Sequence, residues 1–168
     1  VILGDAVYFP DMEHNFYHSV PGISSSNIRR FGQSQLHAFE EENETTPAMK
    51  FGTAAHSLIV EGEYPDVFNS PFERAIFWWE QDLLLKVKSD VVRYPLNSPH
   101  QSNAIILVDY KTTVDCSVRG FTSSIRKYQY DLQAAWYKRG FEKAGFNVVD
   151  FIFVAQERKN LLQVRSLK

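Results

Sequence analysis

A short apolar run, residues 104–108 (AIILV), is the feature that most restricts how this chain can fold. Five consecutive apolar residues are typical of a β-strand that is buried on both faces. The run ends in Asp109 and Lys111, which are two positions apart and therefore leave a strand on the same face. A buried carboxylate or ammonium loses several kcal/mol of hydration. The pair is therefore either a surface salt bridge at a strand end, which is the commoner arrangement, or part of a functional site.

The remaining patterns predict one domain with the element order α-β-β-β-α-β. Residues 1–22 contain helix-breaking prolines and are expected to be irregular. Three serines from Ser24 predict the N-cap of a helix that runs towards Phe39. Further helices are expected over residues 50–61, 118–127 and 130–144, and further strands over residues 74–80, 83–93, 148–155 and 161–165.

The composition excludes several classes of protein. A chain of 168 residues with 44% hydrophobic side chains has the size of one domain with a real core. Its single cysteine, Cys116, excludes an internal disulfide and a cysteine-only zinc or iron–sulfur site. The sequence has no apolar run of about 20 residues and no basic-then-apolar leader, so we expect a cytoplasmic protein without a membrane partner.

The net charge of −2 conceals an uneven distribution of charge along the chain. Residues 1–83 hold 4 Lys/Arg and 13 Asp/Glu, whereas residues 84–168 hold 14 Lys/Arg and 7 Asp/Glu. The two parts therefore carry about −9 and +7, which is compatible with a basic face that follows nucleic-acid phosphates. Uneven scatter of charge in a short chain is the other explanation, and composition alone does not choose between them.

A second carboxylate is expected beside Asp109. In residues 83–93 the apolar Leu85 and Val87 alternate with polar residues that include Asp90, at a hairpin distance from Asp109. Two carboxylates at one point repel each other unless a cation lies between them, and oxygen ligands suit Mg²⁺ or Mn²⁺. With Lys111 beside them, these groups are typical of metal-assisted hydrolysis of a phosphodiester.

Other polar residues have a structural and a functional interpretation. His56 lies on the apolar face of its predicted helix, where a histidine is more often a core residue than a ligand. Glu73 is either a solvated edge residue or a further carboxylate of the site. Tyr130, Gln133 and Tyr137 share one helix face, and the amide of Gln133 needs a polar partner there.

Four stretches in this order resemble the PD-(D/E)XK nuclease superfamily, and most of all the RecE (exonuclease VIII) branch of phage and prophage recombination exonucleases. They are residues 17–26 (YHSVPGISSS), 51–56 (FGTAAH), 86–90 (KVKSD) and 108–113 (VDYKTT). The resemblance implies a restriction-endonuclease-like core, with a mixed central β-sheet flanked by helices, in one domain over residues 1–168.

The resemblance also implies a metal site. His56, Asp90, Asp109 and the backbone carbonyl of Tyr110 would bind the catalytic Mg²⁺, for which Mn²⁺ would substitute. Lys111 would position or activate the attacking water. The resemblance therefore implies that the chain is an exodeoxyribonuclease.

Further roles follow from the same likeness. Gln133 and Tyr137 match a glutamine–tyrosine helix that orders the lysine and the DNA strand, and Glu73 matches an acidic position that assists a metal or a water. Contacts to DNA, including a 5′-phosphate at a helix start, are expected from Ser24, Ser26, Arg29, Lys86, Lys88 and Tyr130.

In this family the reaction is degradation of linear double-stranded DNA from 5′ to 3′, which leaves 3′ overhangs for homologous recombination by strand annealing. The expected partners are DNA ends and a RecT-like single-strand annealing protein, and the expected assembly is a ring of three or four copies. The expected location is the cytoplasm of a bacterial or phage-infected cell.

The chain departs from the family pattern in two ways. Ser89 precedes Asp90 where relatives have proline, and only 16 residues separate His56 from Glu73, where relatives carry a longer insertion. Either this is a shortened member, or segments between about residues 62 and 72 and after 168 are absent from the sequence. Two other functions remain open: a RecB-like nuclease module of a larger repair complex, and a DNA-end binding module without catalysis.

Overall fold

The computed structural model describes residues 2–3, 5–10, 12–32, 34, 46–59, 72–95, 103–159 and 164–167. Its elements in chain order are β1 (Ile2–Leu3), β2 (Ala6–Phe9), α1 (His14–Ser19), α2 (Ser25–Phe31), α3 (Pro47–Ile59), β3 (Phe72–Glu80), β4 (Leu83–Arg93), β5 (Ala104–Thr113), α5 (Val118–Tyr128), α6 (Tyr130–Lys143), β6 (Asn147–Glu157) and β7 (Val164–Leu167).

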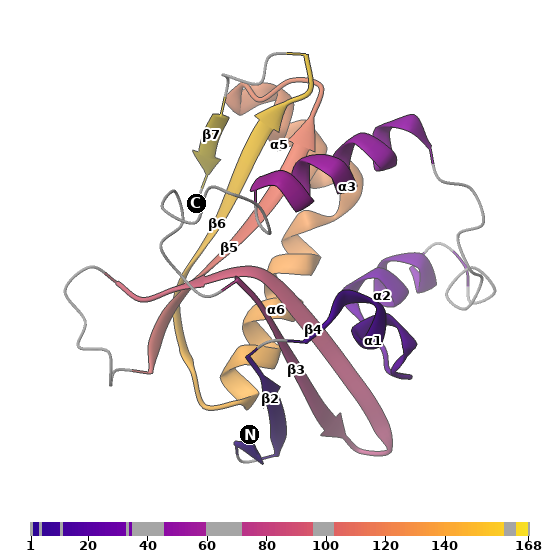
Figure 1. Ribbon diagram of the computed structural model, residues 1–168, viewed down its shortest axis with the longest axis vertical. Helices are drawn as coiled ribbons and strands as arrows, with labels where there is room; N and C mark the ends of the chain where they lie inside the picture. Colours follow the sequence, from indigo (N-terminus) through magenta and orange to yellow (C-terminus); the bar gives the residue numbers. More distant parts are fainter. Residues whose placement is uncertain are drawn as a thin grey trace.

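The strands form a single seven-stranded sheet in which spatial order follows chain order. Neighbouring strands are antiparallel except β5 and β6, which are parallel and are connected through α5 and α6 (Figure 1). A parallel pair requires such a crossover, because the chain must return to the starting end of the sheet. The mixed sheet and its flanking helices confirm the predicted α/β class.

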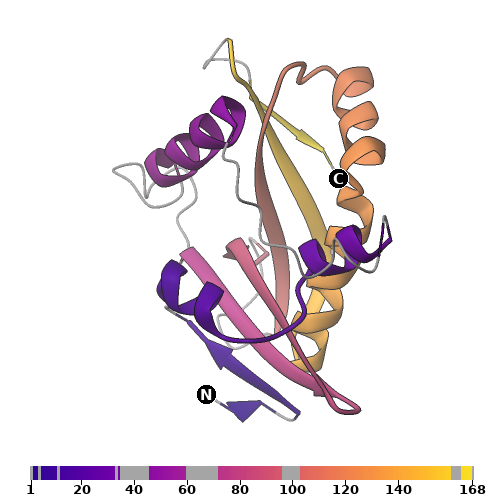
Figure 2. The same cartoon turned by 90° about the vertical axis from the view of Figure 1, so that its right-hand side faces the viewer.

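Helices cover both faces of the sheet (Figure 2). On one face, α6 packs against β3, β4 and β6, and its Phe141 lies in a buried cluster with Trp78 and Val87. On the other face, Ala55 of α3 packs against Val108 and further residues of β4 and β5. The central strands β4 and β5 are therefore covered on both faces by helices from different parts of the chain.

Close contact between α6 and the sheet depends on Gly140. A Cβ atom at this position would lie 2.6 Å from Cγ1 of Val87 and 2.8 Å from Cζ3 of Trp78. Both distances are well inside van der Waals contact, so only glycine lets the helix approach this closely. The close packing of α6 on the sheet places the polar residues of this helix next to β5.

The predicted strand 83–93 and the predicted helices near residues 118–144 are confirmed within a residue or two. The prediction that residues 1–22 are irregular is wrong, because they contain β1, β2 and α1. Short elements of this kind give too little periodicity to recognise. The helix from Ser25 ends at Phe31, earlier than predicted, with Gly32 as its C-cap and Ser34 outside the helix. Residues 33 and 35–39 of its predicted range, like residues 60–61 and 161–163, lie outside the described residues.

The strand predicted for residues 104–108 is longer than the apolar run. It continues to Thr113, because residues 109–113 keep parallel pairing with residues 153–157 of β6. Asp109 and Lys111 therefore lie within a strand rather than after one. None of the described helices is long and apolar enough to cross a membrane.

Candidate functional site

Two carboxylates lie side by side where β4 and β5 diverge. Val91 of β4 faces Val108 of β5, and Asp90 and Asp109 are the next residues on these antiparallel strands. The backbone N–H of Tyr110 donates a hydrogen bond of 2.8 Å to Oδ2 of Asp90. The predicted proximity of Asp90 and Asp109 is thus a consequence of strand register.

Asp109 is fully buried and has two partners on its own face of the sheet. Its exposed fraction is 1%, its Oδ2 forms a salt bridge with Nζ of Lys111, and its Oδ1 accepts a hydrogen bond of 2.9 Å from Nε2 of Gln133. The same Gln133 nitrogen lies 3.0 Å from the hydroxyl oxygen of Tyr137, to which it donates. The two-residue spacing of Asp109 and Lys111 therefore places both on one face, and α6 supplies the amide.

Asp90 is engaged from the other side by α3. Nε2 of His56 lies 3.2 Å from Oδ1 of Asp90. The helix comes close to β5 because Gly52 has no side chain: a Cβ there would lie 3.3 Å from Oγ1 of Thr112. His56 is therefore at the carboxylates and is not a core histidine.

Burial and charge move the pKa values of the two carboxyls in opposite directions. Burial raises the pKa of Asp109 to about 6, and the charge of Asp90 adds to this while Lys111 opposes it. Burial also opposes ionisation of Asp90, but the hydrogen bond from His56 and the charge of Lys111 outweigh it and lower its pKa. The pKa of Lys111 is raised because Asp109 and Asp90 outweigh its burial, so Lys111 is an ammonium near neutral pH.

The residue types at this point suit a hard divalent cation, since carboxylate and carbonyl oxygens and an imidazole are all suitable ligands. Among the described residues, no group of three or more His, Cys, Asp or Glu side chains gathers as a metal site. His56 contacts Asp90, whereas Asp109 contacts Lys111 and Gln133. A cation bound here would compete with His56 and Lys111 for the carboxylates.

Glu73 lies on β3, where the register that pairs Phe72 with Val91 and Arg74 with Ser89 places it opposite Asp90. Its Oε2 is 2.6 Å from Nζ of Lys88, which lies 3.5 Å from Nδ1 of His14. Glu73 also has a left-handed backbone, with φ of 31°. Glu73 neutralises Lys88 in the structure and lines the same cavity as Asp90, and its role as a further carboxylate of the site stays a prediction.

Lys86 and Lys88 are buried instead of forming an exposed basic face. Nζ of Lys86 donates to the carbonyl oxygens of Tyr17 at 3.0 Å and Val20 at 2.7 Å, and only 7% of the residue is exposed. Its pKa is lowered by burial. The interpretation of Lys86 as a DNA contact is therefore corrected: it anchors the end of α1 to β4.

The predicted contacts near α2 are also used within the protein. Ser24 caps the helix, and its N–H and hydroxyl lie 2.9 and 2.7 Å from Oδ1 of Asn27. Arg29 donates to the carbonyl oxygen of Tyr128 at 3.0 Å and to the hydroxyl of Ser26 at 3.2 Å. Arg29 thus fixes the end of α5 against α2.

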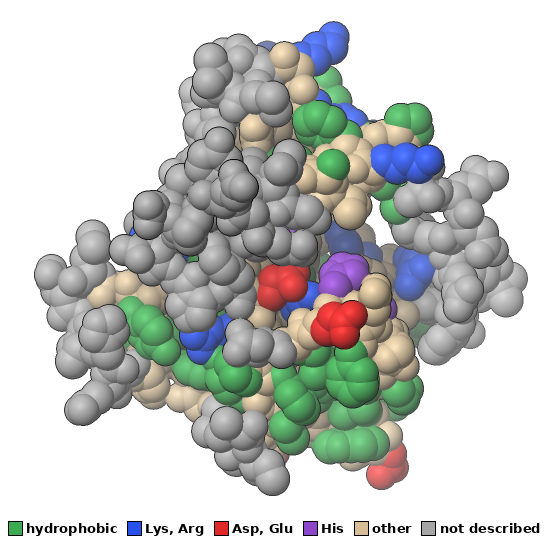
Figure 3. Space-filling view, viewed as in Figure 1, with side chains coloured by type: hydrophobic (Ala, Val, Ile, Leu, Met, Phe, Trp, Pro, Cys, Tyr) green, Lys and Arg blue, Asp and Glu red, His purple; other side chains and the backbone are tan. Residues whose placement is uncertain are grey.

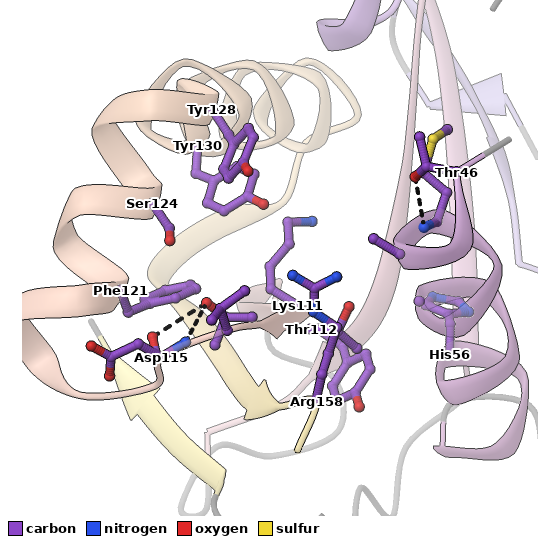
Figure 4. Close-up of a pocket in the computed structure, with 16 residues that line it drawn as sticks. Thr46, His56, Lys111, Thr112, Asp115, Phe121, Ser124, Tyr128, Tyr130 and Arg158 are labelled. Atoms are coloured by element: carbon purple, nitrogen blue, oxygen red, sulfur yellow. Dashed lines mark hydrogen bonds between the residues drawn. The ribbon is translucent and has the colours of Figure 1, made fainter. Parts of the chain in front are cut away.

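Two cavities flank the carboxylates. One, of about 540 Å³, lies on the side of α1 and β4, and its lining includes Asp90, Glu73, Lys88 and Tyr137. The other, of about 520 Å³, lies beyond Lys111 (Figure 4). Acidic, basic and histidine side chains meet near the centre of the molecular face in Figure 3. One cavity thus reaches Asp90 and the other reaches Lys111, whereas Asp109 lies buried between them.

Several residues at these cavities carried no predicted role. His14 and His18, four positions apart on α1, have ring centroids 4.5 Å apart with their planes tilted by 50°, and both line the first cavity. Their spacing was visible in the sequence, but the segment had no recognisable helix around it. Tyr128 and Arg158 line the second cavity, and no motif marks them.

Comparisons of the chain with family models, with curated proteins and with solved structures gave no match.

Proposed function

We propose that this chain is a Mg²⁺-dependent exonuclease that degrades linear double-stranded DNA from 5′ to 3′. One observation carries the proposal: Asp90, Asp109 and Lys111 converge on adjacent strands, with Lys111 bridged to the buried Asp109. A purely structural salt bridge between Asp109 and Lys111 would not require a second carboxylate beside it, yet the charge of Asp90 contributes to the raised pKa of Asp109. Clustered carboxylates beside a lysine suit metal-assisted phosphodiester hydrolysis.

The topology supports membership of the PD-(D/E)XK superfamily. Three antiparallel strands, β3 to β5, are followed by two helices and by β6 parallel to β5. Asp90, Asp109 and Lys111 lie on the central strands β4 and β5, and Gln133 and Tyr137 come from α6, the second of the two helices. This combination matches the expectation from the RecE-like sequence motifs.

The cation would be held by Asp90, Asp109, His56 and the carbonyl of Tyr110, and when bound it would polarise the phosphodiester and lower the pKa of a water. Lys111, which is bridged to Asp109, would stabilise negative charge at the reacting phosphate and position or activate the attacking water. Gln133 holds Oδ1 of Asp109 in place. Burial of the cluster strengthens each of these electrostatic effects.

The same proposal includes the biological setting that the family likeness implies. The products are 3′ single-stranded overhangs for recombination, the partner is a RecT-like annealing protein, and the assembly is a ring of three or four copies in the cytoplasm. These points rest on the sequence resemblance.

Incubation of linear, nicked circular and closed circular duplex DNA with Mg²⁺ tests the reaction. We expect loss of the linear substrate only, abolished by Asp109→Ala and by Lys111→Ala. Asp131→Ala and Lys138→Ala are matched controls, because both residues are exposed on α6. Cleavage of the closed circle would indicate an endonuclease, and binding without any product from the wild-type protein would refute both enzymatic interpretations.

A further inference from the structure

The cavity beyond Lys111 adjoins the proposed catalytic centre but has a different character. It lies between the end of β5, α3 and the junction of α5 with α6, and it shares Gly52 and His56 with the cavity on the other side. Figure 4 shows Lys111 and Arg158 between the tyrosines of this junction and His56 of α3. Its volume of about 520 Å³ is in the range of small-ligand sites.

Two tyrosines form a rigid aromatic wall of this cavity. The rings of Tyr128 and Tyr130 are stacked, with centroids 5.6 Å apart and planes at 28°. Between them, Gln129 has a left-handed backbone (φ 53°, ψ 47°), a conformation that non-glycine residues adopt rarely. The hydrogen bond from Arg29 to the carbonyl of Tyr128 fixes this junction. The stack is therefore organised before any ligand binds.

The wall remains accessible and is surrounded by positive charge. Tyr128 is 48% exposed, and Nζ of Lys127 lies 5.2 Å from its ring centroid. Nζ of Lys111 lies at the same distance from the ring of Tyr130. Partly exposed aromatic rings beside cations are features with which proteins hold unpaired nucleotides, and a base on Tyr128 would take the place of the Lys127 side chain over its ring.

A basic side chain in the cavity is available for a phosphate. Arg158 lines the cavity and forms no salt bridge with any described residue. Asp115, the acidic residue of the lining, accepts a hydrogen bond of 2.8 Å from the backbone N–H of Ser117 in its own loop. The charge of the cavity therefore favours an anion.

We propose that this cavity binds one unpaired nucleotide of a DNA strand, with the base stacked on Tyr128 and the phosphate at Arg158. The inference rests on the proposed function for its substrate class. Stacking uses the π-face that every base has, so the pocket selects an unpaired base without selecting a sequence. It would thereby hold a strand that has left the duplex next to Lys111.

Fluorescence anisotropy in EDTA tests the pocket without hydrolysis. The probes are a labelled dT 12-mer and an abasic strand of the same length. We expect Tyr128→Ala to weaken binding of the dT strand by about 10-fold and to leave binding of the abasic strand unchanged. Tyr128→Phe keeps the ring and should bind as the wild type does. Trp79→Ala is the control, since Trp79 is an aromatic residue of β3 with 58% exposure.

A second variant tests the phosphate contact. Arg158→Ala should weaken binding of both strands and reduce the slope of log affinity against log salt by about 0.7, as expected for one phosphate contact on a single strand. The inference would be overturned if Tyr128→Ala bound the dT strand with wild-type affinity or lost equal affinity for the dT and abasic strands. An unchanged salt slope in Arg158→Ala would overturn it as well. Duplex hydrolysis is measured in a separate assay. If the protein hydrolyses the duplex but Tyr128→Ala binds the dT strand normally, only this inference is refuted. If Tyr128→Ala loses affinity for the dT strand but the wild-type protein does not hydrolyse the duplex, only the proposed function is refuted.

Discussion

The side-chain amide of Gln133 donates a hydrogen bond of 2.9 Å to Oδ1 of Asp109, and this contact joins α6 to β5 in the buried interior. It occupies one carboxylate oxygen and leaves the other to Lys111. The geometry of the proposed catalytic cluster therefore depends on a helix residue that does not itself need to touch DNA.

Replacement of Gln133 tests this positioning role. We expect Gln133→Leu to lower kcat for duplex degradation by at least about tenfold, because the buried oxygen of Asp109 loses a partner worth about 1–3 kcal/mol. Affinity for DNA measured in EDTA should stay unchanged. Gln133→Glu should lose activity as well, because an ionised glutamate cannot donate the hydrogen bond to Asp109. Gln129 is exposed, but its left-handed backbone makes Gln129→Leu unsuitable as a control. Asp131→Asn, on the exposed side of α6, is the control, and a parallel loss of affinity in Gln133→Leu would speak against a purely positioning role.

Replacement of Gly140 tests the packing that brings α6 to the sheet. A methyl group at Gly140 would overlap Val87 and Trp78, and we expect Gly140→Ala to lower the free energy of unfolding by about 1–3 kcal/mol. Urea unfolding followed by circular dichroism measures this change. Gly32→Ala is the control, because its added Cβ would meet its nearest neighbour at an ordinary 3.5 Å. Equal stability of the two variants would contradict the close helix–sheet contact.

Replacement of Lys86 separates a structural from a DNA-binding role. Lys86→Met removes the donor to the carbonyl oxygens of Tyr17 and Val20, and we expect the free energy of unfolding to fall by about 1–3 kcal/mol. Affinity for DNA and its salt dependence should not change. Lys138→Met, at an exposed site, is the matched control for stability. A smaller salt slope in Lys86→Met at unchanged stability would restore the interpretation of Lys86 as a phosphate contact.

The pH dependence of stability tests the environment of His18. Its pKa is lowered by burial and by the neighbouring His14, Lys86 and Lys88. The unfolded chain therefore binds this proton more readily than the folded one, so the contribution of His18 to stability is complete above about pH 6.5 and is lost as the pH falls through the lower folded pKa. We expect urea midpoints of the wild type to fall between pH 7.5 and pH 5 by more than those of His18→Gln. Identical pH profiles of the two proteins would show that His18 is not perturbed.

The centre of the site could be predicted from the sequence because it depends on short-range regularities. The two-residue spacing of Asp109 and Lys111 fixes their common face, and hairpin pairing of neighbouring strands brings Asp90 beside Asp109. The polar Gln133 on an apolar helix face predicted that a buried partner exists. Which partner it has depends on how α6 crosses the sheet.

The surroundings of the site depend on long-range packing and could not be predicted in this way. The alternation of β4 predicts that Lys86 is exposed, but α1 covers it. This helix has only six residues and little periodicity of its own. Glu73 pairs with Lys88 through the β3–β4 register and an unusual backbone conformation. The stack of Tyr128 on Tyr130 depends on the left-handed conformation of Gln129, which no sequence motif predicts.

Release of acid-soluble nucleotides from a uniformly labelled linear duplex, in a titration with Mg²⁺, tests the central claim most directly. The wild-type protein and Asp131→Asn should release nucleotides in proportion to Mg²⁺ until saturation, and Asp109→Asn, which keeps the shape of the side chain but removes its charge, should release none at any concentration. Release by Asp109→Asn at the wild-type rate, or no release by the wild-type protein with either Mg²⁺ or Mn²⁺, would contradict the account.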